Sequence, residues 1–159
     1  MDSLLDQKEI DGSLSEILRR LDEVLEVNLA QRTDLSGAAM IVRSDYPILA
    51  LQELARNAVI HRTYDGTNAP VRLTWFDDRV EITNPGGPFG AVSIGNFGQP
   101  GATDYRNPIL AAAAKDLGFM QRFGSGIPRA RSALRRNGNP PPAFQAEAGF
   151  LNAIIRAVP

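Results

Sequence analysis

The sequence has 159 residues, of which 43% are hydrophobic and 22% charged, and its formal net charge at pH 7 is −1. We expect one globular domain over 1–159, because this composition supports a packed core and excludes a disordered chain. The chain has no cysteine and one histidine, which excludes disulfides, thiolate metal sites and histidine-rich metal sites. It has neither a membrane-spanning apolar run nor a signal-peptide pattern, so we expect a cytoplasmic protein with no membrane partner.

Apolar periodicity predicts two helices in the first half of the chain. Residues 13–33 open with the capping-box pattern SLSE, and apolar residues then recur every three or four positions, behind a flexible lead at 1–12. A second helix is predicted over 46–62, with a proline suited to its first turn. Between the two helices, a short strand at 39–42 is one option.

The remaining elements come in blocks of strands and helices. They are a hairpin at 71–84, an irregular glycine- and proline-rich segment at 86–107, helices at 107–118 and 125–138, and a second hairpin at 143–158. Long irregular segments in compact domains are usually functional lids or disordered stretches. The blocks predict an α+β two-layer sandwich, with helices on one face of a mostly antiparallel sheet.

The helix over 46–62 carries a polar stripe. Glu53, Asn57 and His61 recur at intervals of four and so share one face of the helix, and Arg62 follows directly. Polar stripes usually face solvent, but this one combines an acid, a neutral amide and the only histidine. A glutamate can take a proton from water, an asparagine oxygen can bind Mg²⁺, and histidine with arginine can meet phosphate oxygens.

Two glycine pairs follow the stripe. The sequence NPGG places Asn84 at the end of a predicted strand, ahead of Gly86 and Gly87, where an amide could read a purine edge and a ligand could approach the backbone. The sequence GSG places Gly124 and Gly126 directly before a helix, where backbone N–H groups suit an anion such as phosphate. Each pattern alone is equally compatible with an ordinary turn, and no P-loop motif occurs in the chain.

The order of these motifs resembles the GHKL or Bergerat-type ATP-binding fold, also called the histidine-kinase-like ATPase fold. More closely, ELARNAVIHRTY, FDDRVEITNPGG, RNPILA and GSGIPR are similar to the motifs of RecG-like helicase C-terminal domains and AlbA-associated transcriptional regulators. The resemblance covers roughly residues 13–158. It does not extend to helicase activity, because the chain is too short to hold paired motor domains.

The resemblance assigns roles to particular residues. It implies Glu53 as the general base of a possible ATPase, Asn57 as the Mg²⁺ ligand and residues 86–107 as a lid over ATP. The implied nucleotide-binding residues are Asn57, His61, Arg62, Asn84, Gly86, Gly87, Gly124, Ser125, Gly126 and Ile127. The fold usually presents an aspartate to the adenine amino group, whereas Asn84 offers an uncharged oxygen and therefore a weaker bond.

The resemblance also leaves other functions open. Such ATPases often need a homodimer or a partner to become active, and relatives usually carry a separate DNA-binding domain. The alternative function is a degenerate nucleotide site in a regulatory module whose arginine-rich segment, 122–136, binds DNA or a protein. A solvated helix face would explain the same arginines.

Overall fold

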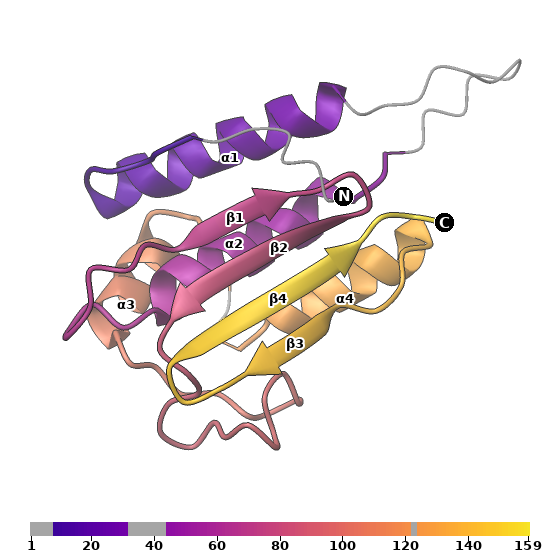
Figure 1. Ribbon diagram of the computed structural model, residues 1–159. Coiled ribbons are helices and arrows are strands. Elements are labelled where there is room, and N and C mark those ends of the chain that lie inside the picture. Colours follow the sequence, from indigo (N-terminus) through magenta and orange to yellow (C-terminus); the bar gives the residue numbers. More distant parts are fainter. Residues whose placement is uncertain (1–7, 32–43, 122–123) are drawn as a thin grey trace, which may run out of the picture.

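The computed structural model describes residues 8–31, 44–121 and 124–159. Its elements are, in chain order, α1 (Leu14–Gln31), α2 (Ile48–His61), β1 (Arg72–Trp75), β2 (Arg79–Pro85), α3 (Pro108–Asp116), α4 (Gly126–Asn137), β3 (Ala143–Ala146) and β4 (Phe150–Arg156). The strands form one antiparallel sheet in the order β1-β2-β4-β3 (Figure 1). No helix in the described ranges is long and apolar enough to cross a membrane.

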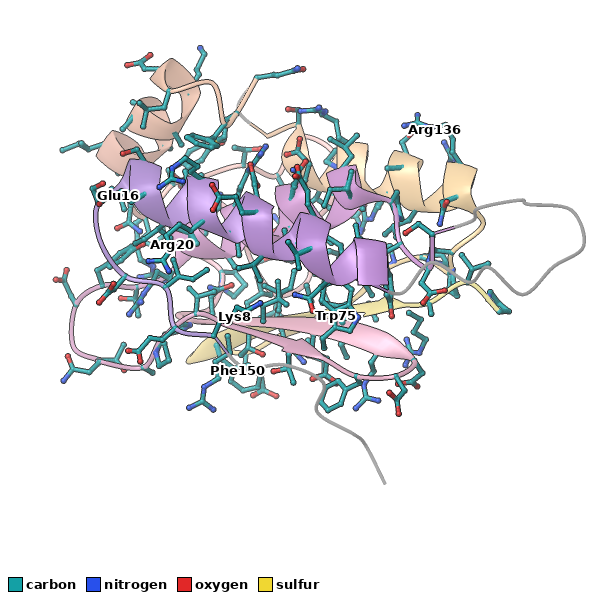
Figure 2. The ribbon with its side chains drawn as sticks, turned by 90° about the horizontal axis from the view of Figure 1, so that it is seen from above. Lys8, Glu16, Arg20, Trp75, Arg136 and Phe150 are labelled. Atoms are coloured by element: carbon teal, nitrogen blue, oxygen red, sulfur yellow. The ribbon has the colours of Figure 1, made fainter. Side chains whose placement is uncertain are left out.

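The helices cover one face of the sheet, so the protein has two layers. In Figure 1, α2 and α4 lie behind the strands and α1 runs along the edge formed by β1. Figure 2 shows the sheet nearly edge-on, with Trp75 between α1 and the strands and Phe150 on the opposite side of the sheet. This arrangement confirms the predicted α+β sandwich.

The main core lies between the sheet and the helices α1, α2 and α4. Its fully buried members include one residue from each of these helices and one from each of the central strands β2 and β4: Leu25, Leu51, Leu134, Val80 and Ile155. A second cluster joins α1, α2 and α3. Packing on both sides therefore fixes α2 in the middle of the helix layer, and α2 is the helix that carries the polar stripe.

The predicted helices and hairpins are all present, with boundaries close to those expected. The capping box forms, since the Ser13 N–H donates to the Glu16 carboxylate over 2.8 Å and the Glu16 N–H faces the Ser13 hydroxyl. Gly118 and Gly138 follow α3 and α4 in the left-handed conformation. The optional strand at 39–42 and most of the lead at 1–12 fall outside the described residues.

A buried asparagine ties the ends of three segments together. Asn139 Nδ2 donates to the carbonyl oxygens of Asp45, over 2.7 Å, and of Arg156, over 3.0 Å, and Asn139 Oδ1 accepts from Asn137. These bonds connect the end of α4 to the end of β4 and to the segment that leads into α2. They therefore hold the helix layer in register with the sheet.

We expect Asn139→Ala to lower the free energy of unfolding by about 2 kcal/mol, because two partly buried hydrogen bonds lose their donor. Urea unfolding of the variant measures this difference. Asn68→Ala, a change at an exposed loop asparagine, is the matched control and should leave the unfolding midpoint in place. Equal midpoints for the two variants would show that Asn139 does not join these segments.

Candidate functional site

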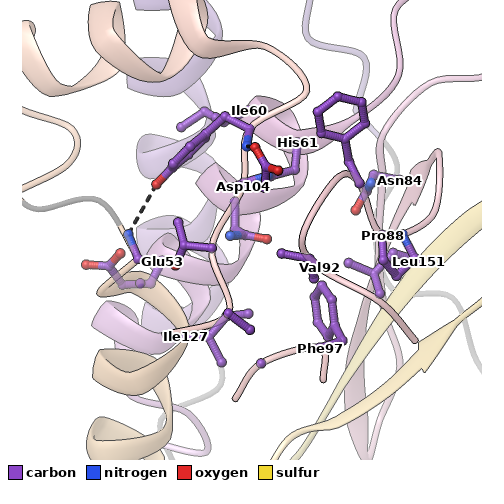
Figure 3. A pocket seen from close by; sticks show the side chains of 18 of the residues that line it. Glu53, Ile60, His61, Asn84, Pro88, Val92, Phe97, Asp104, Ile127 and Leu151 are labelled. Atoms are coloured by element: carbon purple, nitrogen blue, oxygen red, sulfur yellow. Dashed lines mark hydrogen bonds between the residues drawn. The ribbon is translucent and has the colours of Figure 1, made fainter. Parts of the chain in front are cut away.

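A pocket opens between α2, the end of β2, the glycine-rich segment 86–107 and the start of α4. It encloses about 910 Å³, its open mouth included. Figure 3 shows Glu53 and Ile127 on the helix side, Asn84 and Leu151 on the sheet side, and Val92 and Phe97 between them. The predicted site residues that line it are Glu53, Asn57, His61, Asn84, Gly86, Gly87, Gly124, Gly126 and Ile127. The polar stripe of α2 thus faces a cavity.

Glu53 is buried, with 6% of its surface exposed, at the contact between α2 and α4. Its Oε1 lies 2.5 Å from Arg129 Nη1, as an ion pair without hydrogen-bond geometry. Burial raises the pKa of the Glu53 carboxyl, while the positive charges of Arg129 and Arg56 oppose that rise. A carboxylate with a raised pKa is suited to accept a proton near neutral pH.

Two asparagines present amide groups to the pocket. The side chain of Asn57, one turn along α2 from Glu53, makes no hydrogen bond to another described residue. Asn84 is 2% exposed at the end of β2, and its Nδ2 donates to the Pro85 carbonyl over 3.3 Å. No described residue donates to the Asn84 Oδ1. Both side chains therefore keep an acceptor for a ligand.

His61 is enclosed at the other end of the stripe. Its ring stacks on Tyr105 of the glycine-rich segment, with ring centroids 4.9 Å apart and planes 26° apart. Burial lowers the pKa of His61 from 6.5 to about 4, so the imidazole is neutral at pH 7. It can therefore contact a phosphate only as a neutral hydrogen-bond donor and not as a cation.

The glycines after β2 make close contacts within the protein. Gly86 has φ +88° and donates its N–H to the Gly149 carbonyl over 2.9 Å. A Cβ atom at Gly87 would collide with the carbonyl oxygen of Glu147. The two glycines are thus required where the end of β2 packs against the β3–β4 turn, in addition to lining the pocket.

The glycines before α4 also accommodate neighbouring groups. Gly124 has φ +74°, and a Cβ atom there would lie 2.5 Å from the Thr103 hydroxyl oxygen. The Gly124 N–H donates to the Tyr105 hydroxyl over 3.1 Å, drawn as a dashed line in Figure 3. A Cβ atom at Gly126 would lie 3.2 Å from Glu53 Oε2. The absence of side chains in this turn therefore lets both the glycine-rich segment and the buried Glu53 carboxylate pack against it.

Two predicted nucleotide contacts, Arg62 and Ser125, do not line the pocket. Arg62 leaves the helical conformation at the end of α2, and its guanidinium donates to the Ala69 carbonyl over 2.8 Å and lies over the Tyr64 ring. Ser125 is the residue before α4, and its carbonyl accepts from the Arg129 N–H. The structure thus separates Arg62 from the stripe that it follows in sequence.

The arginines of α4 differ in exposure and in their contacts, with Arg129 and Arg131 partly exposed. Arg129 pairs with Glu53, and Arg131 donates to the Gly98 carbonyl of the glycine-rich segment over 2.5 Å. Arg135 and Arg136 are exposed. In the described part of the predicted basic segment 122–136, two of the four arginines are therefore held by contacts within the protein.

Several pocket residues were not predicted from the sequence. Phe97, Asp104 and Tyr105 come from the irregular glycine-rich segment, and Phe97 packs edge-on against Phe144 of β3. Asp104 accepts hydrogen bonds from the backbone N–H groups of Ala91 and Tyr105, which lower the pKa of its carboxyl. No periodic signal marks these positions, because the segment has no regular secondary structure.

Comparison with known proteins gives a family and one solved structure. The family model described as "Putative ATP-dependent DNA helicase recG C-terminal" matches residues 68–155, more than half of the chain. The crystal structure of the DIP2311 protein from Corynebacterium diphtheriae is similar over 93% of this chain, with 25% sequence identity and a TM-score of 0.73. This chain spans 29% of that protein. No curated protein matches the sequence.

His61 is the only histidine in the chain, so the pH dependence of stability near neutral pH reports how deeply this residue is buried. An unfolded chain protonates His61 near pH 6.5, whereas the folded chain does so only near pH 4, so stability is lost as the pH falls through this window. We expect a loss of about 2 kcal/mol in the free energy of unfolding between pH 7.5 and pH 5 from this residue.

Urea unfolding at the two pH values measures this loss. His61→Phe is the control, because it keeps a ring against Tyr105 but cannot titrate. The variant should therefore lose about 2 kcal/mol less than the wild type over the same pH range. An equal pH dependence in the two proteins would contradict the buried, neutral state of His61.

Proposed function

The chain belongs to the RecG C-terminal family of ATPase-like domains, and from this premise we propose that its pocket binds ATP together with Mg²⁺. One observation supports the proposal most strongly. Three segments far apart in sequence bring Glu53 and Asn57, then Asn84, and then Gly124 and Gly126 to the walls of one cavity. An amide oxygen can bind Mg²⁺, a glycine turn before a helix suits phosphate, and an acid can accept a proton from water.

The sheet side of the pocket suits the adenine base. Asn84 Oδ1 accepts no hydrogen bond from a described residue, so it can accept one from the exocyclic amino group of adenine. Leu151, Val92 and Ile127 line the same pocket and supply apolar surface for the faces of the base. A neutral acceptor gives an uncharged and therefore modest hydrogen bond.

The helix side suits phosphates and a metal ion. Helix α4 directs its N-terminal end, where Gly124 and Gly126 lie, toward the pocket, and this end of a helix attracts anions. Asn57 would hold Mg²⁺ through its side-chain oxygen. Mg²⁺ typically binds one or two protein ligands and completes its coordination shell with phosphate oxygens and water. The bound ion then neutralises part of the phosphate charge. No group of three acidic or histidine residues in the described ranges offers a metal site without phosphates.

Glu53 is the residue placed to support hydrolysis. Its carboxylate lines the pocket one turn from Asn57, where it can accept a proton from a water molecule that attacks the terminal phosphorus atom. The charge of Arg129 opposes the rise in the Glu53 pKa that burial causes, and the ion pair fixes the position of the carboxylate.

We extend the proposal to a nucleotide-binding module of a transcriptional regulator with a GHKL-type fold. Support for this step comes from the motifs NPGG and GSG and from their order in the chain. DNA contact would then be made by a separate domain, and a homodimer or a partner would activate ATP hydrolysis. In the described residues 124–136 the exposed arginines are Arg135 and Arg136, which are too few for an extensive phosphate-binding surface.

Asn57→Ala tests ATP binding directly. With Mg-ATP at about 100 times its dissociation constant, the wild type should gain about 2.7 kcal/mol of stability, a rise of several degrees in Tm. Asn57→Ala should show a smaller rise, and Asn68→Ala, changed at an exposed asparagine, should show the full one. An unchanged Tm of the wild type in millimolar Mg-ATP and Mg-ADP would refute the proposal.

Glu53→Gln separates binding from hydrolysis. The amide keeps the shape of the side chain and an oxygen that can accept a hydrogen bond from Arg129, so α4 stays in place and we expect retained ATP affinity. Because the amide is not a base, we expect at least a tenfold loss of phosphate release. Single-turnover measurements with saturating protein detect slow turnover. Wild-type turnover in Glu53→Gln would remove Glu53 from the role of general base and leave ATP binding intact.

A further inference from the structure

We propose that the Tyr105 hydroxyl is an internal competitor of the nucleotide phosphates: in the ligand-free protein it occupies the backbone donor at the start of α4. This inference rests on the proposed nucleotide-binding function. It adds that phosphate can enter this position only when Tyr105 leaves it. The glycine-rich segment would then respond to phosphate and not to the base.

The contact itself shows the competition. The Gly124 N–H donates to the Tyr105 oxygen over 3.1 Å, two residues before the N-terminus of α4, the end of a helix that attracts anions. One N–H group has one hydrogen, so a phosphate oxygen and the tyrosine oxygen cannot both occupy its direction at normal distances. The hydroxyl stands in for the acceptor that a phosphate would supply.

Tyr105 is held firmly in this position. Its ring stacks on His61 of α2 at 4.9 Å. Two residues further along, Asn107 Nδ2 donates to the carbonyl oxygens of Ile60, over 2.9 Å, and of Arg62, over 2.7 Å. Tyr105 thus bridges α2 and the turn before α4. Displacing it costs free energy, which the binding of the nucleotide must supply.

Asp104, the residue before Tyr105, adds electrostatic repulsion against phosphate. Asp104 lines the pocket, and two backbone N–H groups hold its carboxylate at 2.9 Å and 2.8 Å. These bonds lower the pKa of Asp104, so it carries a negative charge at neutral pH. A polyphosphate entering the pocket would meet this charge, which opposes its binding while the segment stays in place.

Thr103, next to Asp104, also packs against the turn before α4. Its hydroxyl oxygen lies so close to Gly124 that a Cβ atom there would be 2.5 Å away. Residues 103–105 therefore pack as a unit on the turn that begins α4. Adenosine has no phosphate and needs no movement of this unit, whereas ATP does.

Tyr105→Phe is the decisive variant, because it keeps the ring stacked on His61 and removes the competing oxygen. Calorimetry should show ATP binding about fivefold tighter than in wild type, and adenosine binding unchanged. Asp104→Asn should also tighten ATP and not adenosine. Tyr64→Phe and Asp65→Asn, made outside the pocket, are the matched controls and should match the wild type.

A second readout needs no nucleotide. In Tyr105→Phe the Gly124 amide loses its acceptor, so its hydrogen exchange should accelerate in the ligand-free protein relative to Tyr64→Phe. Unchanged or weaker ATP binding in Tyr105→Phe, or equal tightening of ATP and adenosine, would overturn the inference alone. No nucleotide binding by any of the proteins would instead remove the proposed function on which it rests.

Discussion

The contact between the buried Glu53 carboxylate and the Arg129 guanidinium is the interaction on which the site depends. A carboxylate with 6% of its surface exposed is stable in ionised form only beside a cation, and Arg129 supplies that charge from the first turn of α4. The pair sets how α4 sits against α2, with Gly126 leaving room for the carboxylate. The helix that carries Asn57 and the turn that carries Gly124 therefore face the same cavity.

The helices and hairpins were predictable from the sequence, because each is specified by a local pattern of apolar residues. The spacing of Glu53, Asn57 and His61 gave one face of α2, but tertiary packing decided that this face meets a pocket and not solvent. Arg62 follows the stripe in sequence, yet the chain leaves the helix there and turns its side chain toward Ala69.

Other parts of the site were outside the reach of sequence patterns. Asp104 and Tyr105 belong to an irregular segment, and their positions depend on bonds to Ala91 and Gly124, far away in the chain. The glycine motifs indicated backbone approach by a ligand. In the structure the same glycines are also required by the protein itself, as at Gly87, where the β3–β4 turn allows no side chain.

The central claim is that one cavity holds both ends of a Mg-nucleotide, and an NMR titration tests it most directly. Amide and side-chain spectra of the ¹⁵N-labelled wild type should be followed while a non-hydrolysable Mg-ATP analogue is added. We expect saturable shifts of the Asn57 and Asn84 side-chain amides and of the Gly124 backbone amide, with one common dissociation constant. Shifts confined to α1 or to the exposed end of α4, or no saturable shifts, would contradict it.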